Sequence, residues 1–241
     1  MTSHIENSYL NSVSFSTDEI INNIDCLNKF RNENIVILFN NFQAANKLSD
    51  IENIEEFVNR SITSTAKVLD YIKNFKNIEK LIYTSSSSVY GDNKHCSEDD
   101  IPHPISLQAS LKLSNEFFIK QYCIEYKVDY TILRVFNMYG GDDSFSVISK
   151  IINAVVNNTQ LTLVNNGSGV RDFVHIDDVV EVILKWLVYN GVHKGVKLLN
   201  GMFAIALLLY SVVRASLFDH DFTILIKEKY ENQEYIGGKS K

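Results

Sequence analysis

The chain has 241 residues, of which 45% are hydrophobic and 22% are charged, and its formal net charge is −6. This length supplies enough apolar material for the core of one large or two small globular domains. The acidic balance argues against a nucleic-acid partner, because nucleic-acid binders present a basic surface to the phosphate backbone.

Short apolar runs alternate with helical patterns along the chain. This alternation is typical of βαβ units around a mainly parallel sheet. In chain order, the predicted elements are a strand at Ile35–Phe39, a helix at Ile54–Phe75, a strand at Leu81–Thr84, a helix at Ser106–Tyr126, a strand at Tyr130–Phe136, a helix at Ser144–Asn157, a strand at Leu161–Val164, a helix at Asp177–Tyr189, a strand at Val196–Leu199 and a helix near Ala204–Phe218.

Aromatic residues recur at helical spacing in the predicted helix Ser106–Tyr126. A stripe of this kind usually marks the face that a helix turns toward the core. We therefore interpret these residues as core positions and not as a platform for stacking a ligand. They are Phe117, Phe118, Tyr122 and Tyr126.

Three further features bear on the compartment and on metals. The first ten residues lack the basic start and the apolar core of a signal peptide. The most apolar stretch, Met202–Val213, is too short to span a bilayer comfortably. The three cysteines have no metal-ligand spacing. We expect a cytoplasmic chain without a membrane contact or a bound metal; the cysteines are Cys26, Cys96 and Cys123.

A group of serines follows the predicted strand Leu81–Thr84. The segment from Tyr83 to Gly91 holds four serines in succession, at positions 85 to 88. Seventeen residues after Gly91 the next helix places Gln108, and Lys112 follows at i+4, on the same helical face.

This serine segment and three others resemble ordered motifs of the extended short-chain dehydrogenase/reductase family, the NAD-dependent epimerases and dehydratases that act on nucleotide sugars. Pro104–Lys112 matches Pro-x-Ser-x-Tyr-x-x-x-Lys, with Gln108 in the tyrosine place. Leu133–Gly140 matches Leu-Arg-x-x-Asn-x-Tyr-Gly, and Asn166–Asp178 contains Arg-Asp-Phe-Val-His-x-x-Asp. The resemblance extends from about residue 9 to about residue 220.

The resemblance implies a Rossmann-like, doubly wound parallel sheet with a small substrate-binding α+β lobe. We expect residues 1–140 to form the NAD-binding domain and residues 141–241 to form the lobe, interleaved with the last Rossmann strands. Residues 9–30 match the family's third strand and the helix after it, so we expect the sheet to be N-terminally incomplete. In the strand order 3-2-1-4-5-6, this leaves Ile35–Phe39 as an exposed apolar edge.

The resemblance also assigns the catalytic positions, which are Ser86, Gln108 and Lys112. Ser86 would hydrogen-bond the sugar hydroxyl that is oxidised, and Lys112 would contact the nicotinamide ribose. Gln108 stands where the family has the tyrosine that moves the proton. A primary amide has no pKa near neutrality, so the general acid–base contribution, worth about 10²–10⁴ in rate, is expected to be missing. Tyr90 is the candidate replacement for this tyrosine, but by resemblance the family uses a tyrosine at that position for packing.

By resemblance, cofactor-binding residues are Ala44, Ala45 and Lys112, and substrate-binding residues are Asn137 and Arg171. Arg171 would hold the diphosphate of a nucleotide-diphosphate sugar with its planar donor fork. The family cradles the NAD pyrophosphate in a Gly-x-x-Gly-x-x-Gly turn at a helix N-terminus. All ten glycines of this chain lie at position 91 or later, so we expect it to bind NAD weakly or not at all.

Two functions are carried forward. The first is nucleotide-sugar interconversion for surface polysaccharide synthesis, with turnover impaired by Gln108. By resemblance, an epimerase-like or reductase-like relative is favoured because Ser87 and Ser88 replace the Asp-Glu pair of the 4,6-dehydratases, and the nucleotide-sugar 4-epimerases are taken as the nearest relatives. The alternative is a non-catalytic nucleotide-sugar-binding protein or partner subunit, acting as a homodimer or paired with an intact relative. The sequence leaves the sugar, the nucleotide and the oligomeric state open.

Overall fold

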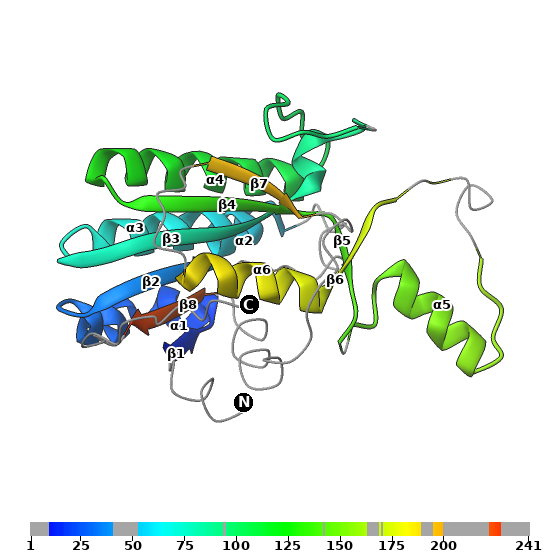
Figure 1. Ribbon diagram of the computed structural model, residues 1–241, viewed down its shortest axis with the longest axis horizontal. Helices are drawn as coiled ribbons and strands as arrows, with labels where there is room; N and C mark the ends of the chain where they lie inside the picture. Colours follow the sequence, from blue (N-terminus) through cyan, green and yellow to red (C-terminus); the bar gives the residue numbers. More distant parts are fainter. Residues whose placement is uncertain are drawn as a thin grey trace, which may run out of the picture.

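A computed structural model describes residues 10–40, 53–93, 95–141, 143–162, 169, 171–188, 195–199 and 222–227. Within these ranges the chain forms a six-stranded sheet and a separate two-stranded sheet (Figure 1). In order across the large sheet, the strands are β1 (Leu10–Phe15), β8 (Phe222–Lys227), β2 (Asn34–Phe39), β3 (Asn77–Ser86), β4 (Asp129–Val135) and β7 (Gly195–Leu199).

The centre of the large sheet is parallel, as the sequence predicts. β2, β3, β4 and β7 run in the same direction, so their carboxyl ends meet at one edge. The predicted strands at Ile35–Phe39, Tyr130–Phe136 and Val196–Leu199 are confirmed within a residue or so, and β3 is longer than the predicted Leu81–Thr84.

The expectation that Ile35–Phe39 forms an exposed edge is wrong. β8 lies beside β2 in an antiparallel pair that runs from Ile35 opposite Ile226 to Phe39 opposite Phe222. All five side chains from Ile35 to Phe39 are at most 2% exposed. No strand is predicted from the sequence at Phe222–Lys227. In the structure this segment, β8, also pairs with β1 and so connects Leu10–Phe15 to the rest of the sheet.

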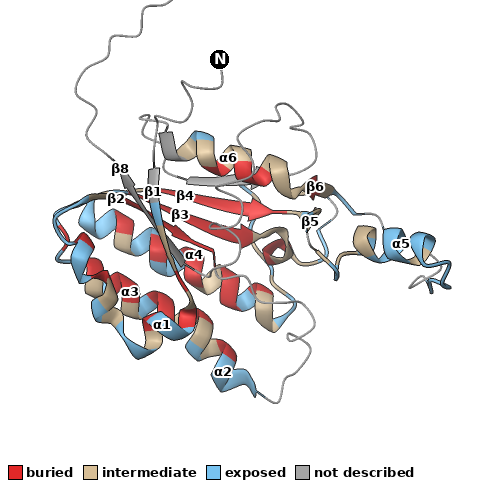
Figure 2. Ribbon diagram, turned by 90° about the horizontal axis from the view of Figure 1, so that it is seen from below, coloured by how far each residue is buried: buried red, intermediate tan, exposed pale blue. Residues whose placement is uncertain are grey.

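Helices cover both faces of the sheet (Figure 2), which confirms the doubly wound architecture. Side chains alternate along β2, so Ile35 and Ile37 belong to one core while Val36 and Leu38 belong to the other. The second face carries α6 (Ile176–Val188). The first face carries α1 (Thr17–Asn22), the 3-10 helix η2 (Ile24–Phe30), α2 (Ile54–Val58), α3 (Ser64–Ile72) and α4 (Leu107–Tyr126).

The predicted helices that fall within the described residues are confirmed with small differences. The helix expected at Ile54–Phe75 is α2 and α3 joined by a π-helical turn, Asn59–Thr63. α4 is capped by the Ser106 hydroxyl, which accepts from the Ala109 amide. α6 begins at Ile176, one residue before Asp177, which lies in its first turn.

The interpretation of the α4 aromatics as core residues is wrong for three of the four. Phe117, Phe118 and Tyr126 are 57%, 44% and 47% exposed, while Tyr122 is half-buried against the core. The reason is that α4 turns a partly polar face inward: its buried residues are Ala109, Leu111, Lys112, Asn115, Glu116, Ile119 and Cys123.

The described residues between β4 and α6 form the smaller sheet and a projecting helix. β5 (Asn137–Tyr139) pairs in parallel with β6 (Phe173–His175), and α5 (Val147–Val156) extends away from the large sheet (Figure 1). Leu161 and Thr162, from the predicted strand Leu161–Val164, are in no strand. The predicted helix near 204–218 lies outside the described residues, and the domain division at residue 140 stays a prediction. No helix in the described ranges is long and apolar enough to cross a membrane.

Candidate active site

The serine segment forms a tight turn where β3 ends. β3 finishes at Ser86, and a 3-10 helix, Ser87–Tyr90, follows at once. We call residues Ser85–Tyr90 the serine turn. The Ser86 Oγ accepts hydrogen bonds from the Ser88 amide at 3.2 Å and from the Ser88 hydroxyl at 2.9 Å. A hydroxyl has two acceptor positions and one proton, so with Ser88 as the donor the half-buried Ser86 hydroxyl can donate its own proton to a ligand.

Lys112 reaches the same end of β3 from α4. Its side chain is buried, and its Nζ donates to the Thr84 carbonyl oxygen at 2.8 Å, two residues before Ser86. The Nζ also lies 5.1 Å from the centroid of the Tyr83 ring. The structure therefore brings Ser86 and Lys112 to one edge of the sheet, as the sequence predicts.

Gln108 lies one helical turn before Lys112 and is half-buried. Its amide can donate and accept hydrogen bonds but cannot take up or release a proton near neutral pH.

The hydroxyl of Tyr90 already has two hydrogen-bond partners. Its hydroxyl accepts from the Arg134 Nη1 at 2.6 Å and donates to the Ser97 carbonyl oxygen at 2.7 Å. Burial raises the pKa of the Tyr90 phenol, although the Arg134 guanidinium opposes this shift. A phenol that is buried, hydrogen-bonded on both sides and raised in pKa is a poor substitute for the missing base.

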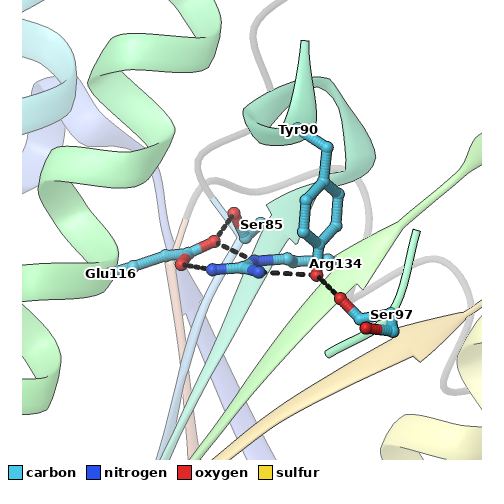
Figure 3. A network of polar contacts seen from close by, with 5 residues as sticks. All are labelled: Ser85, Tyr90, Ser97, Glu116 and Arg134. Atoms are coloured by element: carbon cyan, nitrogen blue, oxygen red, sulfur yellow. Dashed lines mark hydrogen bonds and ion pairs between the residues drawn. The ribbon is translucent and has the colours of Figure 1, made fainter. Parts of the chain in front are cut away.

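A buried polar network joins the serine turn to α4 and β4 (Figure 3). The Ser85 hydroxyl donates to the Glu116 carboxylate at 2.5 Å. Arg134 donates to both oxygens of the same carboxylate, from Nε at 3.0 Å and from Nη2 at 2.7 Å. The sequence reading misses this network, although one signal was present: Glu116 lies at i+4 from Lys112, on the face that carries the site.

The predicted substrate residues lie together at the smaller sheet. Asn137 begins β5 opposite Phe173 of β6, and its Nδ2 donates to the Asp172 carbonyl oxygen at 2.8 Å. Arg171 precedes Asp172 directly, and both Asn137 and Arg171 are exposed. The β5–β6 pair therefore brings the two predicted substrate residues into one exposed corner.

Comparisons with known proteins agree with this geometry. A model of the NAD dependent epimerase/dehydratase family matches residues 12–197. The chain is 36% identical to Protein CapI of Staphylococcus aureus over 169 residues, which are 68% of this chain and 50% of that protein. It is 30% identical to the probable UDP-glucuronate 4-epimerase of Rhizobium meliloti (strain 1021) over 140 residues, 56% of this chain and 40% of that protein.

A solved structure with a similar fold is that of UDP-glucuronic acid 4-epimerase from Bacillus cereus, in complex with UDP-glucuronic acid and NAD. It matches with a TM-score of 0.60 and 29% identity, covering 64% of this chain and 50% of that one. The chain thus spans half or less of the length of these three relatives.

The described residues fit NAD at one end only. Ser86 and Lys112 suit the nicotinamide end, because their polar groups lie at the carboxyl edge of the sheet. A pyrophosphate site needs a strand that ends at this edge in a glycine turn and a helix. On the side away from β3, the neighbour of β2 is β8. Because β8 is antiparallel, it starts at this edge, with Phe222 opposite Phe39, and does not end there as a strand leading into a glycine turn would. With no glycine before Gly91, the described residues do not fit the pyrophosphate end. Ala44 and Ala45 lie outside them.

Proposed function

The chain belongs to the NAD dependent epimerase/dehydratase family, and we propose that it handles a nucleotide-diphosphate sugar as the 4-epimerases do, with turnover impaired by Gln108. The observation that carries this proposal is the site at the end of β3. A hydroxyl donor, Ser86, and a buried ammonium, Lys112, face the same edge, but an amide occupies the position between them in the motif.

The serine turn favours an epimerase-like over a dehydratase-like reaction. Loss of water from a sugar needs an acid and a base that shuttle protons, and the family's dehydratases use an Asp-Glu pair for this. Here the two positions are Ser87 and Ser88, and the Ser88 hydroxyl donates to Ser86. Neither serine has a pKa suited to that task. The turn is built to orient the Ser86 hydroxyl toward a sugar oxygen.

Proton movement is the step that this chain lacks. In an epimerisation, the sugar hydroxyl loses its proton as the hydride leaves, so a group with a suitable pKa must receive that proton. Lys112 donates to the Thr84 carbonyl, and Tyr90 is held by Arg134 and Ser97. The loss of the acid–base term lowers the rate by about 10²–10⁴.

The second candidate function follows from the same amide. A chain that orients a sugar with Ser86 and binds its diphosphate with Arg171, but moves no proton, is a nucleotide-sugar-binding protein. It would then act as a homodimer or as a partner of an intact relative. In either case we propose a cytoplasmic role in supplying activated sugars for surface polysaccharide, on the strength of the family motifs.

Thermal unfolding with a panel of UDP-, GDP-, CDP- and dTDP-sugars, UDP-glucuronic acid included, tests the binding proposal. At a ligand concentration of about 100 times Kd, mass action adds about 2.7 kcal/mol of stability. For a chain of this size, the Tm then rises by about 5–10 °C. Arg171→Ala should abolish the rise, whereas Lys120→Ala, on the exposed side of α4, should keep it. If no nucleotide sugar raises the Tm, or if Arg171→Ala leaves the rise intact, the proposal fails.

A graft distinguishes impaired turnover from binding alone. A Gly-x-x-Gly-x-x-Gly strand and helix from a relative are joined to this chain, with Gln108 kept or changed to tyrosine. Calorimetric titration should detect NAD at micromolar concentration only in the graft. The Gln108→Tyr graft should turn over a nucleotide sugar about 10²–10⁴ times faster than the glutamine graft. Equal rates would show that another residue acts as the base and that Gln108 does not impair turnover.

A further inference from the structure

We propose that Glu116 and Arg134 are positioning residues, which clamp the serine turn at both ends and so fix the place of the Ser86 hydroxyl. The importance of Ser86 rests on the proposed function; the clamp itself rests on the contacts within the chain. These contacts join β3 and the 3-10 helix Ser87–Tyr90 to α4 and to β4, which lie farther along the sequence (Figure 3).

The first end of the turn is held by Glu116. The Ser85 hydroxyl, on the residue just before Ser86, donates to Glu116 Oε1. The β3–β4 register sets Ser85 directly beside Arg134, which donates to both oxygens of the same carboxylate. Counted over backbone and side chain together, the three residues Ser85, Glu116 and Arg134 are each at most 4% exposed. The carboxylate therefore has charged and neutral donors on fixed elements, and Ser85 cannot move without breaking one of its bonds.

The second end of the turn is held by Arg134. Its third nitrogen, Nη1, donates to the hydroxyl of Tyr90, the last residue of the turn, and its guanidinium carbon lies 4.7 Å from the centre of the Tyr90 ring. All three guanidinium nitrogens are thus engaged, two with Glu116 and one with Tyr90. Because the guanidinium is planar, the directions of these bonds are fixed relative to one another.

Ser86 lies between these two held ends. Among the described residues, its Oγ receives bonds from Ser88 alone, which belongs to the same turn, so the position of the hydroxyl depends on the backbone of the turn. Glu116 also lies one helical turn after Lys112 and two after Gln108, so the clamp fixes this face of α4 against the turn. A buried ion pair is a weak source of stability compared with apolar packing. Holding a geometry is the use that the contacts of this pair support.

Hydrogen exchange of the Ser88 amide tests the clamp without any ligand. This amide donates to the Ser86 Oγ, so its exchange rate measured by NMR reports whether the hydroxyl is in place. The test variant combines Ser85→Ala with Tyr90→Phe. It removes the clamp bonds to the turn, together with the bond from the Tyr90 hydroxyl to the Ser97 carbonyl, and keeps the Glu116–Arg134 pair. We expect the Ser88 amide to exchange about threefold to tenfold faster, the effect of losing about one hydrogen bond. In the test variant, the exchange rates of the β4 amides should not change. In the control variant Tyr122→Phe, which alters a half-buried tyrosine elsewhere on α4, the exchange rate of the Ser88 amide should not change.

Two exchange results would overturn the inference. An unchanged Ser88 amide would mean that the turn holds its shape without the clamp. Equal acceleration of the Ser88 and β4 amides would mean that the network only stabilises the whole fold.

Calorimetry with UDP and with UDP-glucuronic acid separates this inference from the proposed function. In the test variant, the affinity for UDP should be unchanged, and the preference for UDP-glucuronic acid over UDP should fall by about threefold to tenfold. A preference that persists in full counts against the clamp. If the wild-type chain itself has no such preference, the proposed function fails for this sugar, and the exchange rates still decide whether the clamp exists.

Discussion

Replacing Glu116 by leucine, Arg134 by methionine, and both together measures how strongly the buried pair is coupled. Each side chain of the pair is 5% exposed, and two parallel hydrogen bonds join them at 2.7 and 3.0 Å. Within the part of the chain that the structure describes, Glu116→Leu leaves a buried guanidinium with Tyr90 as its one remaining partner, and Arg134→Met leaves a buried carboxylate with Ser85. Removing one member of a buried ion pair costs about 3–5 kcal/mol, because the remaining charge stays buried and uncompensated.

The double variant should be far more stable than the sum of the single variants implies. Replacing both charges by apolar side chains of similar size is often nearly neutral, so we expect a coupling energy of at least about 3 kcal/mol. Urea unfolding followed by circular dichroism gives the free energy of unfolding of the four proteins. The exposed pair Arg60–Asp18, with side chains 36% and 65% exposed, is the control and should show a coupling below about 1 kcal/mol.

The reasoning is refuted if the costs of Glu116→Leu and Arg134→Met add to within about 0.5 kcal/mol of the double variant. The two side chains would then not interact in solution, and the network behind the serine turn would have no energetic basis.

Two further changes have defined outcomes. Gly91 has φ +64°, and a Cβ there would lie 2.3 Å from the His103 carbonyl oxygen. Gly91→Ala should therefore cost more than the about 1–2 kcal/mol of left-handed strain alone. At Gly169 an added Cβ would meet no atom of the described residues within 4 Å, so Gly169→Ala should change the free energy of unfolding by less than about 0.5 kcal/mol. Burial would raise the pKa of Asp143, but hydrogen bonds from Ser146 and Ser149 outweigh it and lower the pKa. The carboxylate therefore stabilises the fold above its unfolded pKa of about 3.9, and the stability advantage over Asp143→Asn should vanish as pH falls through the lower folded value. A difference that does not change with pH would contradict this.

The sequence by itself determined the elements whose signals are local. Ile35–Phe39 is an unbroken apolar run, and α4 has a serine cap and a length of 20 residues, so neither needs distant partners to be recognised. The place of the candidate site at the carboxyl edge of the sheet was also predictable. The residues that follow parallel strands meet at one edge of a sheet, and Ser86 and Lys112 follow from this rule and the i+4 spacing.

Only the tertiary structure decided which segment lies beside β2 and which face of α4 is buried. The pairing of Ile35–Phe39 with Phe222–Lys227 joins segments that are far apart in the sequence, and a short apolar run does not by itself specify its partner strand. The aromatic stripe of α4 has the period of a helix, but a period does not say which side faces the sheet. The side of α4 that faces the sheet includes Glu116 and Lys112. A sequence pattern does not predict this side as buried, because charged residues are normally expected at the surface. Their burial becomes favourable only when the β3–β4 register sets Arg134 beside Ser85 and the Thr84 carbonyl meets Lys112. These partners come from distant parts of the chain, so the reason for the buried charges exists only in the folded molecule.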